Sequence, residues 1–475
     1  MGVHENAPGG KDPHFGHAGE ADTREGMAGQ TGPSDPHGRA PVDKVRYLQR
    51  RLWAAAKRSP GRRFHALLDR IYRRDVLEEA WKRVRANRGA AGVDRETLAD
   101  VEAYGVERML DELQAQLRAG TYRPAPVRRQ TIPKADGGER GLGIPTVRDR
   151  VAQQATKLVL EPIFEAGFLP SSYGYRPKRS ATEALERIRL GFIRGYAWVV
   201  EFDIRSYFDS IEQERLLRLV EQRISDRRVV KLVRQWLKAG VLENGRTRET
   251  VTGTPQGGVI SPLLANIYLH ELDRRWIEQG IGELVRYADD GVVLCKTQAE
   301  AEAALGLVRS VLAELGLELH AEKTRKVELQ EGREGFDFLG CHFHARVSGR
   351  QLERGVRRYY LHRWPSQRSM KRVRQRVHDL TGRDRNGVKD VRVLIRDINP
   401  VLRGWGTYFR TGNAAAKFVQ IDTYVWRRLH RFLVKRQGRN LRPGQAERWT
   451  SAWLYSQGLY RLRGTIRYPE VRNHA

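Results

Sequence analysis

The 475-residue chain has little cysteine and no long apolar stretch. Cys295 and Cys341 are its two cysteines, and both lie in apolar, strand-like sequence, which favours buried thiols over a disulfide or a metal site. No apolar run approaches the roughly 18 residues of a membrane-spanning helix, and the N-terminus has no signal-peptide core. These absences predict a cytoplasmic protein that has no membrane partner.

The first 42 residues contain few apolar side chains. Nine glycines and four prolines fall within residues 1–40. A segment of this composition buries too little apolar surface to offset the conformational entropy that it would lose on folding. We therefore expect 1–42 to be a disordered tail.

Acidic residues are scarce relative to basic ones, above all near the C-terminus. The formal net charge is +29, and residues 351–475 contain 29 Lys plus Arg against 8 Asp plus Glu. Such a region usually neutralises phosphates, which gives salt-dependent binding to nucleic acid. Arginine outnumbers lysine by 70 to 16. Guanidinium groups suit bidentate phosphate contacts, although a GC-rich genome would produce the same bias.

Three acidic residues stand out against this basic background. Asp289 and Asp290 lie in RYADDGVV between short apolar runs, and this pattern predicts a β-hairpin with both carboxylates at its turn. Asp203 is presented near the end of a predicted strand over 198–204. Three carboxylates at two strand ends suit a pair of Mg²⁺ ions, which prefer hard oxygen ligands. An acidic pair in a turn is, by itself, more often a solvated turn.

Helical patterns flank these strands. Residues 45–120 read as helical, with candidate core positions at Trp53, Leu67, Leu68, Ile71 and Leu77. Ser180 with Glu183 forms a capping-box pattern, and Ser261 before Pro262 predicts a cap and a first-turn proline. The order of strands and helices is typical of a right-handed polymerase palm that is preceded by fingers.

Nine sequence blocks follow one another in a recognisable order. They are RANRGAAGVD from Arg85, IPKADGGERG from Ile132, SSYGYRPKRS from Ser171, EFDIRSYFDSI from Glu201, TGTPQGGVISP from Thr252, RYADDGVVL from Arg286, LGLELHAEKT from Leu315, GFDFLGCHF from Gly335 and INPVLRGWGTYFR from Ile398. This ordered set resembles the reverse transcriptases encoded by bacterial group II introns, of the type without an endonuclease. The resemblance runs from about Arg85 to about Phe432.

The resemblance implies an α+β fold with right-hand fingers and palm and a helical thumb and maturase domain. We expect a helical N-terminal extension over 43–120, reverse transcriptase fingers and palm over 121–350, and a thumb and maturase domain over 351–440. A short basic and aromatic segment would follow over 441–475, where it could bind DNA.

The resemblance also assigns the metal site. Asp203 and Asp289 would bridge two Mg²⁺ ions, with Asp290 as the third acidic member and the Ile204 carbonyl completing one coordination shell. Asp209 is better explained as a helix cap.

The nucleotide would contact residues outside this carboxylate set. Lys134 and Arg140 would hold the triphosphate, and Gln256 would approach the nucleotide from a glycine-rich loop. Phe208 would lie under the sugar and exclude a 2′-hydroxyl by its bulk. The alternative for Phe208 is a core position between strand and helix.

The maturase region would recognise RNA. We expect Arg403, Arg427 and Arg428 to contact RNA, and Trp405 and Phe409 to belong to the core. The late histidines form no plausible ligand cluster with cysteine, so no metal-dependent endonuclease is expected. These histidines are His362, His378, His430 and His474.

The expected activity is RNA-directed DNA polymerisation that copies intron RNA into DNA, together with assistance to splicing and mobility. Its partners would be group II intron RNA in a ribonucleoprotein, target DNA, a primer and dNTPs, and the complex would associate with the nucleoid. One alternative is a domesticated or defence-associated reverse transcriptase, and another is a maturase that only binds RNA for splicing. The oligomeric state stays open.

Overall fold

The computed structural model has the mixed helix and sheet architecture that the motifs predicted. Lys134, Gln256 and the expected tail at 1–42 lie outside the described residues, and the side chain of Arg140 is likewise not described. The structure describes residues 43–133, 139–243, 246–248, 253, 257–382, 385, 387–437, 441–442 and 444–468.

The N-terminal part is helical, as expected. The long helix α6 (Val147–Glu165) packs against α1 and α3. The helices around it are α1 (Lys44–Arg58), α2 (Leu68–Ile71), α3 (Arg74–Ala86), α4 (Leu98–Tyr104) and α5 (Val106–Ala119).

Four of the five core positions proposed for this part are buried, but Trp53 is 44% exposed. The buried face of α1 repeats through Val45, Leu48, Leu52 and Ala56. Trp53 follows Leu52 directly and is therefore turned about 100° away from that face. Its assignment to the core was wrong.

A small sheet follows these helices. Its strands are β1 (Val127–Pro133), β2 (Glu139–Ile144), β4 (Val241–Glu243) and β5 (Arg246–Arg248), in the order β2-β1-β4-β5. β1 pairs antiparallel with β2 and parallel with β4. Arg140, which is expected to contact the triphosphate, therefore lies on β2, opposite Ile132.

The second sheet, which we call the palm sheet, has the order β6-β7-β3-β8. All its pairings are antiparallel. Its strands are β3 (Trp198–Asp203), β6 (Glu283–Tyr287), β7 (Asp290–Cys295) and β8 (Arg325–Glu328). The predicted strand near 198–204 and the predicted hairpin are both confirmed.

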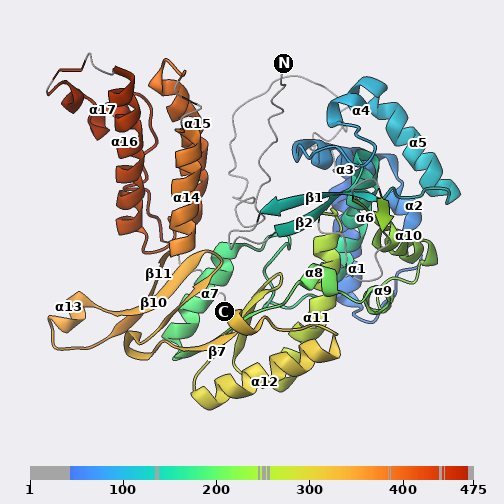
Figure 1. Cartoon of the computed structure of the whole chain (residues 1–475). Helices are drawn as coiled ribbons and strands as arrows, with labels where there is room; N and C mark the ends of the chain where they lie inside the picture. The colour runs from blue at the N-terminus through green and yellow to red at the C-terminus, as the bar shows by residue number, and fades with distance from the viewer. Residues whose placement is uncertain are drawn as a thin grey trace, which may run out of the picture.

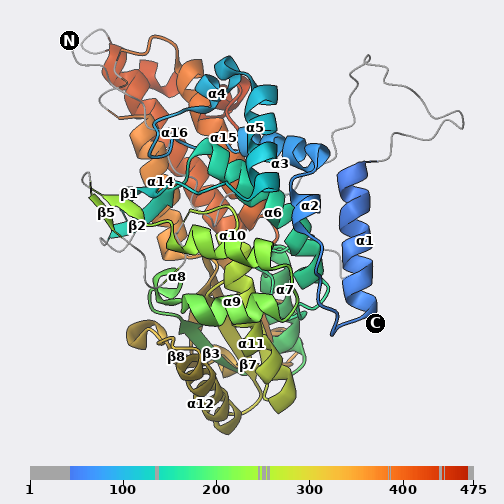
Figure 2. The same cartoon turned by 90° about the vertical axis from the view of Figure 1, so that its right-hand side faces the viewer.

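Helices cover both faces of the palm sheet. α7 (Ala181–Ile193) packs against β6 and β7, and α12 (Gln298–Glu314) packs against β3 and β7. Successive residues of β3 point to opposite faces, so Val199 and Val200 belong to two separate core clusters. Four more helices are seen in the view of Figure 2. They are α8 (Tyr207–Ser210), α9 (Gln213–Glu221), α10 (Arg227–Lys238) and α11 (Ser261–Gln279).

Three sequence-level cap assignments can be checked against these helices. The capping box of Ser180 and Glu183 is present at the start of α7. Ser261, however, is the first residue of α11, while Ile260 occupies the cap position without a side-chain hydrogen bond. Asp209 lies inside α8 and does not cap it. Both of those cap assignments were wrong by one to three residues, the scale on which helix ends are hard to place from sequence.

The third sheet, which we call the outer sheet, has the order β11-β10-β9 and leads into the C-terminal helices. Its strands are β9 (Gly335–Phe338), β10 (Cys341–Val347) and β11 (Tyr359–Pro365), with α13 (Gly349–Leu352) between the last two. Because β10 pairs with β11, the expected domain boundary at 350/351 divides one sheet.

Beyond β11 the chain is helical. α14 (Gln367–Leu380) contacts both α15 (Val391–Phe409) and α16 (Ala415–Gln437), and α17 (Ser451–Ser456) follows. These helices stand on the opposite side of the molecule from α1 to α6 (Figure 1). Among the described helices, none combines the length and the apolar character of a bilayer span.

Candidate functional site

Two of the predicted carboxylates meet at one end of the palm sheet. Asp203 is the last residue of β3 and Asp290 the first of β7, and the two are direct partners in the antiparallel register. Side chains of directly opposed residues point to the same face of a sheet. Asp289 lies beside them in the two-residue turn between β6 and β7. The strand pairing thus brings together residues that are 87 positions apart in the sequence.

The carboxylates at this end repel one another. Burial, followed by the charges of Asp289 and Asp203, raises the pKa of Asp290 to about 8, while Lys323 acts in the opposite direction. Closely placed carboxylates with too little positive charge favour either protonation or a bound cation. Their oxygen atoms are the ligands that Mg²⁺ prefers. Within the described ranges, however, no three His, Cys, Asp or Glu side chains are arranged so that they could hold a metal ion.

Lys323 supplies a counter-charge that the sequence analysis did not assign. Its Nζ lies 2.8 Å from Oδ2 of Asp203, and its side chain is about half exposed. It ends the short 3₁₀ helix η1 (Ala321–Lys323). The backbone N–H of His320 donates to the Asp203 carbonyl at 2.8 Å, which ties this segment to β3. The LGLELHAEKT block was the available signal, since it marks this segment as part of the motif set.

A buried arginine supports the turn of the hairpin. Arg286 is 1% exposed, and its guanidinium donates to both carboxylate oxygens of Asp273, with the Nε bond at 2.8 Å. It also donates to the Ala288 carbonyl at 2.8 Å and to Oδ1 of Asn266 at 3.2 Å. Burial lowers the pKa of Arg286, but the Asp273 carboxylate more than offsets this, and the net shift is upward. The arginine therefore stays charged while it holds the backbone of the turn.

Gly174 packs directly on the same turn. A Cβ atom at this position would lie 2.4 Å from the backbone nitrogen of Ala288, and Ala288 itself has a positive φ of 58°. The Gly174 carbonyl accepts a hydrogen bond from Nδ2 of Asn266 at 2.8 Å. The glycine in the SSYGYRP block thus allows the close approach that sets the position of the two aspartates.

Of the predicted nucleotide contacts, Phe208 is the one whose side chain is described. It lies in α8, five residues after Asp203, and is half-buried against the first core cluster. Its ring centroid is 5.3 Å from that of Tyr207. Tyr207 is fully buried, and its hydroxyl donates to the Ala265 carbonyl at 2.6 Å. This anchor fixes the short helix that carries Phe208.

The three predicted RNA contacts differ in their surroundings. Arg403 and Arg427 are exposed, and the Arg403 guanidinium lies over the Tyr460 ring at 5.5 Å. Arg428 instead donates to the hydroxyl and the carbonyl of Thr381, at 3.0 and 2.9 Å, where α14 ends. Its role in holding two helices together was not expected. Trp405 and Phe409 are buried, which confirms their assignment to the core.

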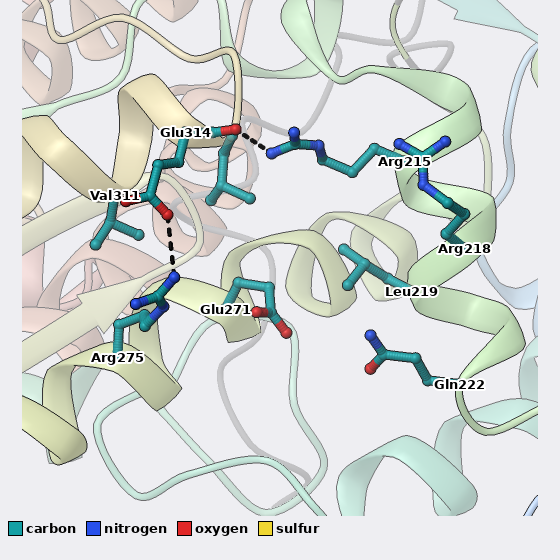
Figure 3. A pocket seen from close by; sticks show the side chains of 9 residues that line it. Arg215, Arg218, Leu219, Gln222, Glu271, Arg275, Val311 and Glu314 are labelled. Atoms are coloured by element: carbon teal, nitrogen blue, oxygen red, sulfur yellow. Dashed lines mark hydrogen bonds and ion pairs between the residues drawn. The ribbon is translucent and has the colours of Figure 1, made fainter.

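Two hollows lie away from the carboxylates. One, of about 350 Å³, lies between α9, α11 and α12 and carries mixed charge (Figure 3). Its arginines face acidic groups, for example Arg275 to Glu314 at 3.1 Å. The other, of about 710 Å³, lies between α16 and the residues that follow it, with Trp426, Trp449 and Tyr455 in its lining. Neither hollow includes a predicted site residue.

Comparisons with known proteins agree with this geometry. The family model described as "Reverse transcriptase (RNA-dependent DNA polymerase)" matches residues 132–343, which contain all three aspartates. The model described as "Group II intron, maturase-specific domain" matches residues 370–450. The fold and the matched domains thus define a reverse transcriptase, an RNA-directed DNA polymerase, followed by a maturase domain.

Individual relatives place the chain more closely. It is 38% identical over 335 residues to Protein YkfC of Escherichia coli K12, a match that covers 62% of this chain and 86% of that protein. It is 41% identical over 212 residues to the Group II intron-encoded protein LtrA of Lactococcus lactis, covering 44% of this chain and 35% of LtrA. An uncharacterised 91 kDa protein in the cob intron of Schizosaccharomyces pombe is 37% identical, covering 43% and 25% of the two chains.

The chain belongs to the reverse transcriptases with maturase domains that group II introns encode. The matched part spans about a third of LtrA and a quarter of the fission yeast protein.

Proposed function

We propose that the palm sheet end is the polymerase active site and that it copies the RNA of a group II intron into DNA. The observation that carries the proposal is the direct pairing of Asp203 with Asp290, with Asp289 in the adjoining turn. Asp203, Asp289 and Asp290, with the Ile204 carbonyl, would hold the divalent ions, which we take to be two Mg²⁺. Such a pair, when bound, activates the attacking 3′-hydroxyl and neutralises the pyrophosphate leaving group.

The residues around the carboxylates would position the nucleotide. Lys134, Arg140 and Gln256 would contact the incoming dNTP, as the family motifs imply. Phe208 stands on a helix that Tyr207 anchors, so its ring could restrict the sugar without being displaced. Lys323 would hold the Asp203 carboxylate in its orientation, because its ammonium group lies within hydrogen-bonding distance.

The maturase domain supports the second part of the proposal. We infer that this chain binds the intron RNA as a ribonucleoprotein and assists its splicing and mobility, with target DNA supplying the primer. The exposed arginines Arg403 and Arg427 lie within α15 and α16 of the basic C-terminal part. They would contact phosphates of the RNA.

The polymerase assignment is tested by extension of a DNA primer on an RNA template with dNTPs and Mg²⁺. Asp203→Asn keeps the shape of the side chain and removes its charge, so extension should fall below detection. Glu318→Gln is the matched control, because this exposed acid pairs with Arg205 near the same strand but lies outside the carboxylate set. Equal extension by parent and Asp203→Asn would refute the assignment of the active site.

A further inference from the structure

The outer sheet has one buried face and one face that is open along β10 and β11. Alternate residues of its strands belong to the second core cluster, among them Phe336, Phe343 and Leu361. The residues between them are exposed or half-buried. On β10 and β11 this open face carries His342, His344, Arg346, Tyr360, His362 and Trp364.

These six side chains form three cross-strand pairs. His342 is opposite Trp364, His344 is opposite His362, and Arg346 is opposite Tyr360. The ring centroids of His342 and Trp364 are 5.2 Å apart, and those of His344 and Trp364 are 6.3 Å apart. The Arg346 guanidinium lies 4.5 Å from the centre of the Trp364 ring. We call this set of flat groups the aromatic face.

A glycine on β9 makes room for the histidine rings. Gly335 is the direct partner of His344, so a side chain there would point to the same face. A Cβ atom on Gly335 would lie 2.8 Å from Nε2 of His342 and 3.0 Å from its Cε1. The His342 ring can therefore lie close to β9 because residue 335 has no side chain.

The aromatic face does not have the properties of a metal site. Within the part of the chain that the structure describes, its histidines form no group of three or more ligands. Burial first, and then the positive charge of Arg346, lowers the pKa of His362. A neutral imidazole behaves as a flat aromatic ring at physiological pH. Nδ1 of His344 has no hydrogen-bond partner among the described residues.

The charges around the face fit phosphates. Arg346 and Arg358 are exposed, and Arg358 lies over the Tyr360 ring at 5.5 Å. Asp337 is the acidic residue on this face of β9, and Nδ1 of His342 lies 2.6 Å from its carboxylate. Flat rings beside guanidinium groups on an open sheet are the arrangement by which proteins stack unpaired bases and hold the backbone.

We propose that the aromatic face binds unpaired RNA, with bases stacking on Trp364, His342 and His344 and with Arg346 contacting phosphate. This deepens the proposed function and rests on it, because the RNA would be the template or the intron. An open sheet face suits bases that are splayed out better than it suits a duplex, whose bases are stacked on each other. The loop from β10 to β11 extends away from the palm sheet, so RNA could reach the face beyond the polymerase site (Figure 1).

The first test measures binding of a short unstructured RNA oligonucleotide to the full chain. The double variant His342→Ala with Trp364→Leu should bind at least about 5-fold more weakly, the lower limit expected when a single base stack is lost. The matched control is His65→Ala with Trp53→Leu, because both of those side chains are exposed on the N-terminal helical part. Photocrosslinks should map to residues 342–364 in the parent and disappear in the double variant.

A second variant keeps the proposal testable if the stacking variant does not fold. Arg346→Gln changes an exposed side chain, and it should lower RNA affinity while reducing the slope of log affinity against log salt by about one. The stacking variant should leave that slope unchanged. Unchanged affinity in both variants, or crosslinks that map elsewhere, would overturn the proposal. A single-stranded DNA of the same sequence tests whether the face recognises RNA: weakening of RNA binding supports the proposal, and weakening of DNA binding alone contradicts it.

Failure of this proposal can be told apart from failure of the proposed function. The stacking variant should still extend a short pre-annealed primer and template at saturating concentration, because the carboxylates are untouched. Asp203→Asn should show the reverse behaviour, with normal binding of the oligonucleotide and no extension.

Discussion

The palm sheet and the outer sheet use antiparallel strands in two different ways. Both faces of the palm sheet are buried, with Val199 and Val200 in separate cores, so its chemistry can be presented only where strands end. The outer sheet buries one face, and its other face displays His342, Trp364 and Arg346 to solvent. The number of buried faces thus decides whether a sheet offers a site at its strand ends or a binding surface on one face.

The two regions also differ in how tightly their residues are held. At the palm sheet end, Arg286 is completely enclosed and holds the hairpin turn through the Ala288 carbonyl. On the outer sheet, the half-buried rings contact one another, Arg346 and Asp337 on an open face. Substitutions should therefore have all-or-none effects in the first region and graded effects in the second.

The largest expected effect is loss of polymerisation when Asp289 and Asp290 are both changed to alanine. Extension should fall below detection, because no other described carboxylate lies at the turn of the hairpin. RNA binding should stay near the parent value, since the basic surface is elsewhere. Primer extension and RNA binding are measured on the same preparation. Full extension by the double variant would show that the polymerase active site does not lie at this end of the palm sheet.

The second largest effect is expected for Arg286→Met. Removing the guanidinium leaves Asp273 buried without its partner, and breaking a buried pair typically costs about 3–5 kcal/mol of unfolding free energy. The double variant Arg286→Met with Asp273→Leu should regain most of this stability, because the uncompensated charge is gone. Denaturant unfolding measures both variants.

The same double variant separates stability from positioning. Its extension rate should remain low, because the Ala288 carbonyl and the turn have lost the donor that holds them. Parent-like extension in a folded double variant would mean that Arg286 only stabilises the fold.

Phe208→Ala should have an intermediate effect. Loss of aromatic bulk should admit ribonucleotides roughly 10- to 100-fold more readily relative to dNTPs, a size typical of steric discrimination. Competition between rNTPs and dNTPs in the extension assay gives this ratio. Phe192→Ala is a matched control, since Phe192 is a half-buried ring packed on the other core cluster. An unchanged ratio of rNTP to dNTP incorporation would mean that Phe208 is a core residue and does not exclude the 2′-hydroxyl.

The smallest expected effects lie on the basic maturase helices. Charge reversal at Arg403 and Arg427 should weaken intron RNA binding severalfold and reduce its salt dependence. Arg428→Gln should instead lower stability by about 1–3 kcal/mol, because its guanidinium bonds the end of α14. Binding at several salt concentrations and thermal unfolding distinguish these effects. Equal salt slopes in the parent and the charge-reversal variant would place RNA recognition elsewhere, the outer sheet included.

Local patterns predicted local features well. The strand-like sequence before Asp203 and the turn at Asp289 define strands and a hairpin that the structure contains. The capping box at Ser180 and Glu183 is present because its hydrogen bonds join residues three positions apart. Trp53 was misplaced because its neighbour Leu52 already occupies the buried face of α1.

Contacts between distant segments escaped prediction. Ser172, Asn266 and Asp273 meet Arg286 from positions 13 to 114 residues away. No periodicity in the sequence joins these positions, so the buried support of the hairpin was not foreseen. β11 was also missed, because its pairing with β10 spans the loop that contains α13 and crosses the expected domain boundary.

The sequence by itself determined the family, the two aspartate strands and the basic character of the C-terminal part, because motifs, short apolar runs and charge are properties of neighbouring residues. Only the tertiary structure decided that Asp203 stands opposite Asp290, that Lys323 reaches Asp203, and that one face of the outer sheet stays open. The physical reason is that register and burial depend on which distant segments pack together.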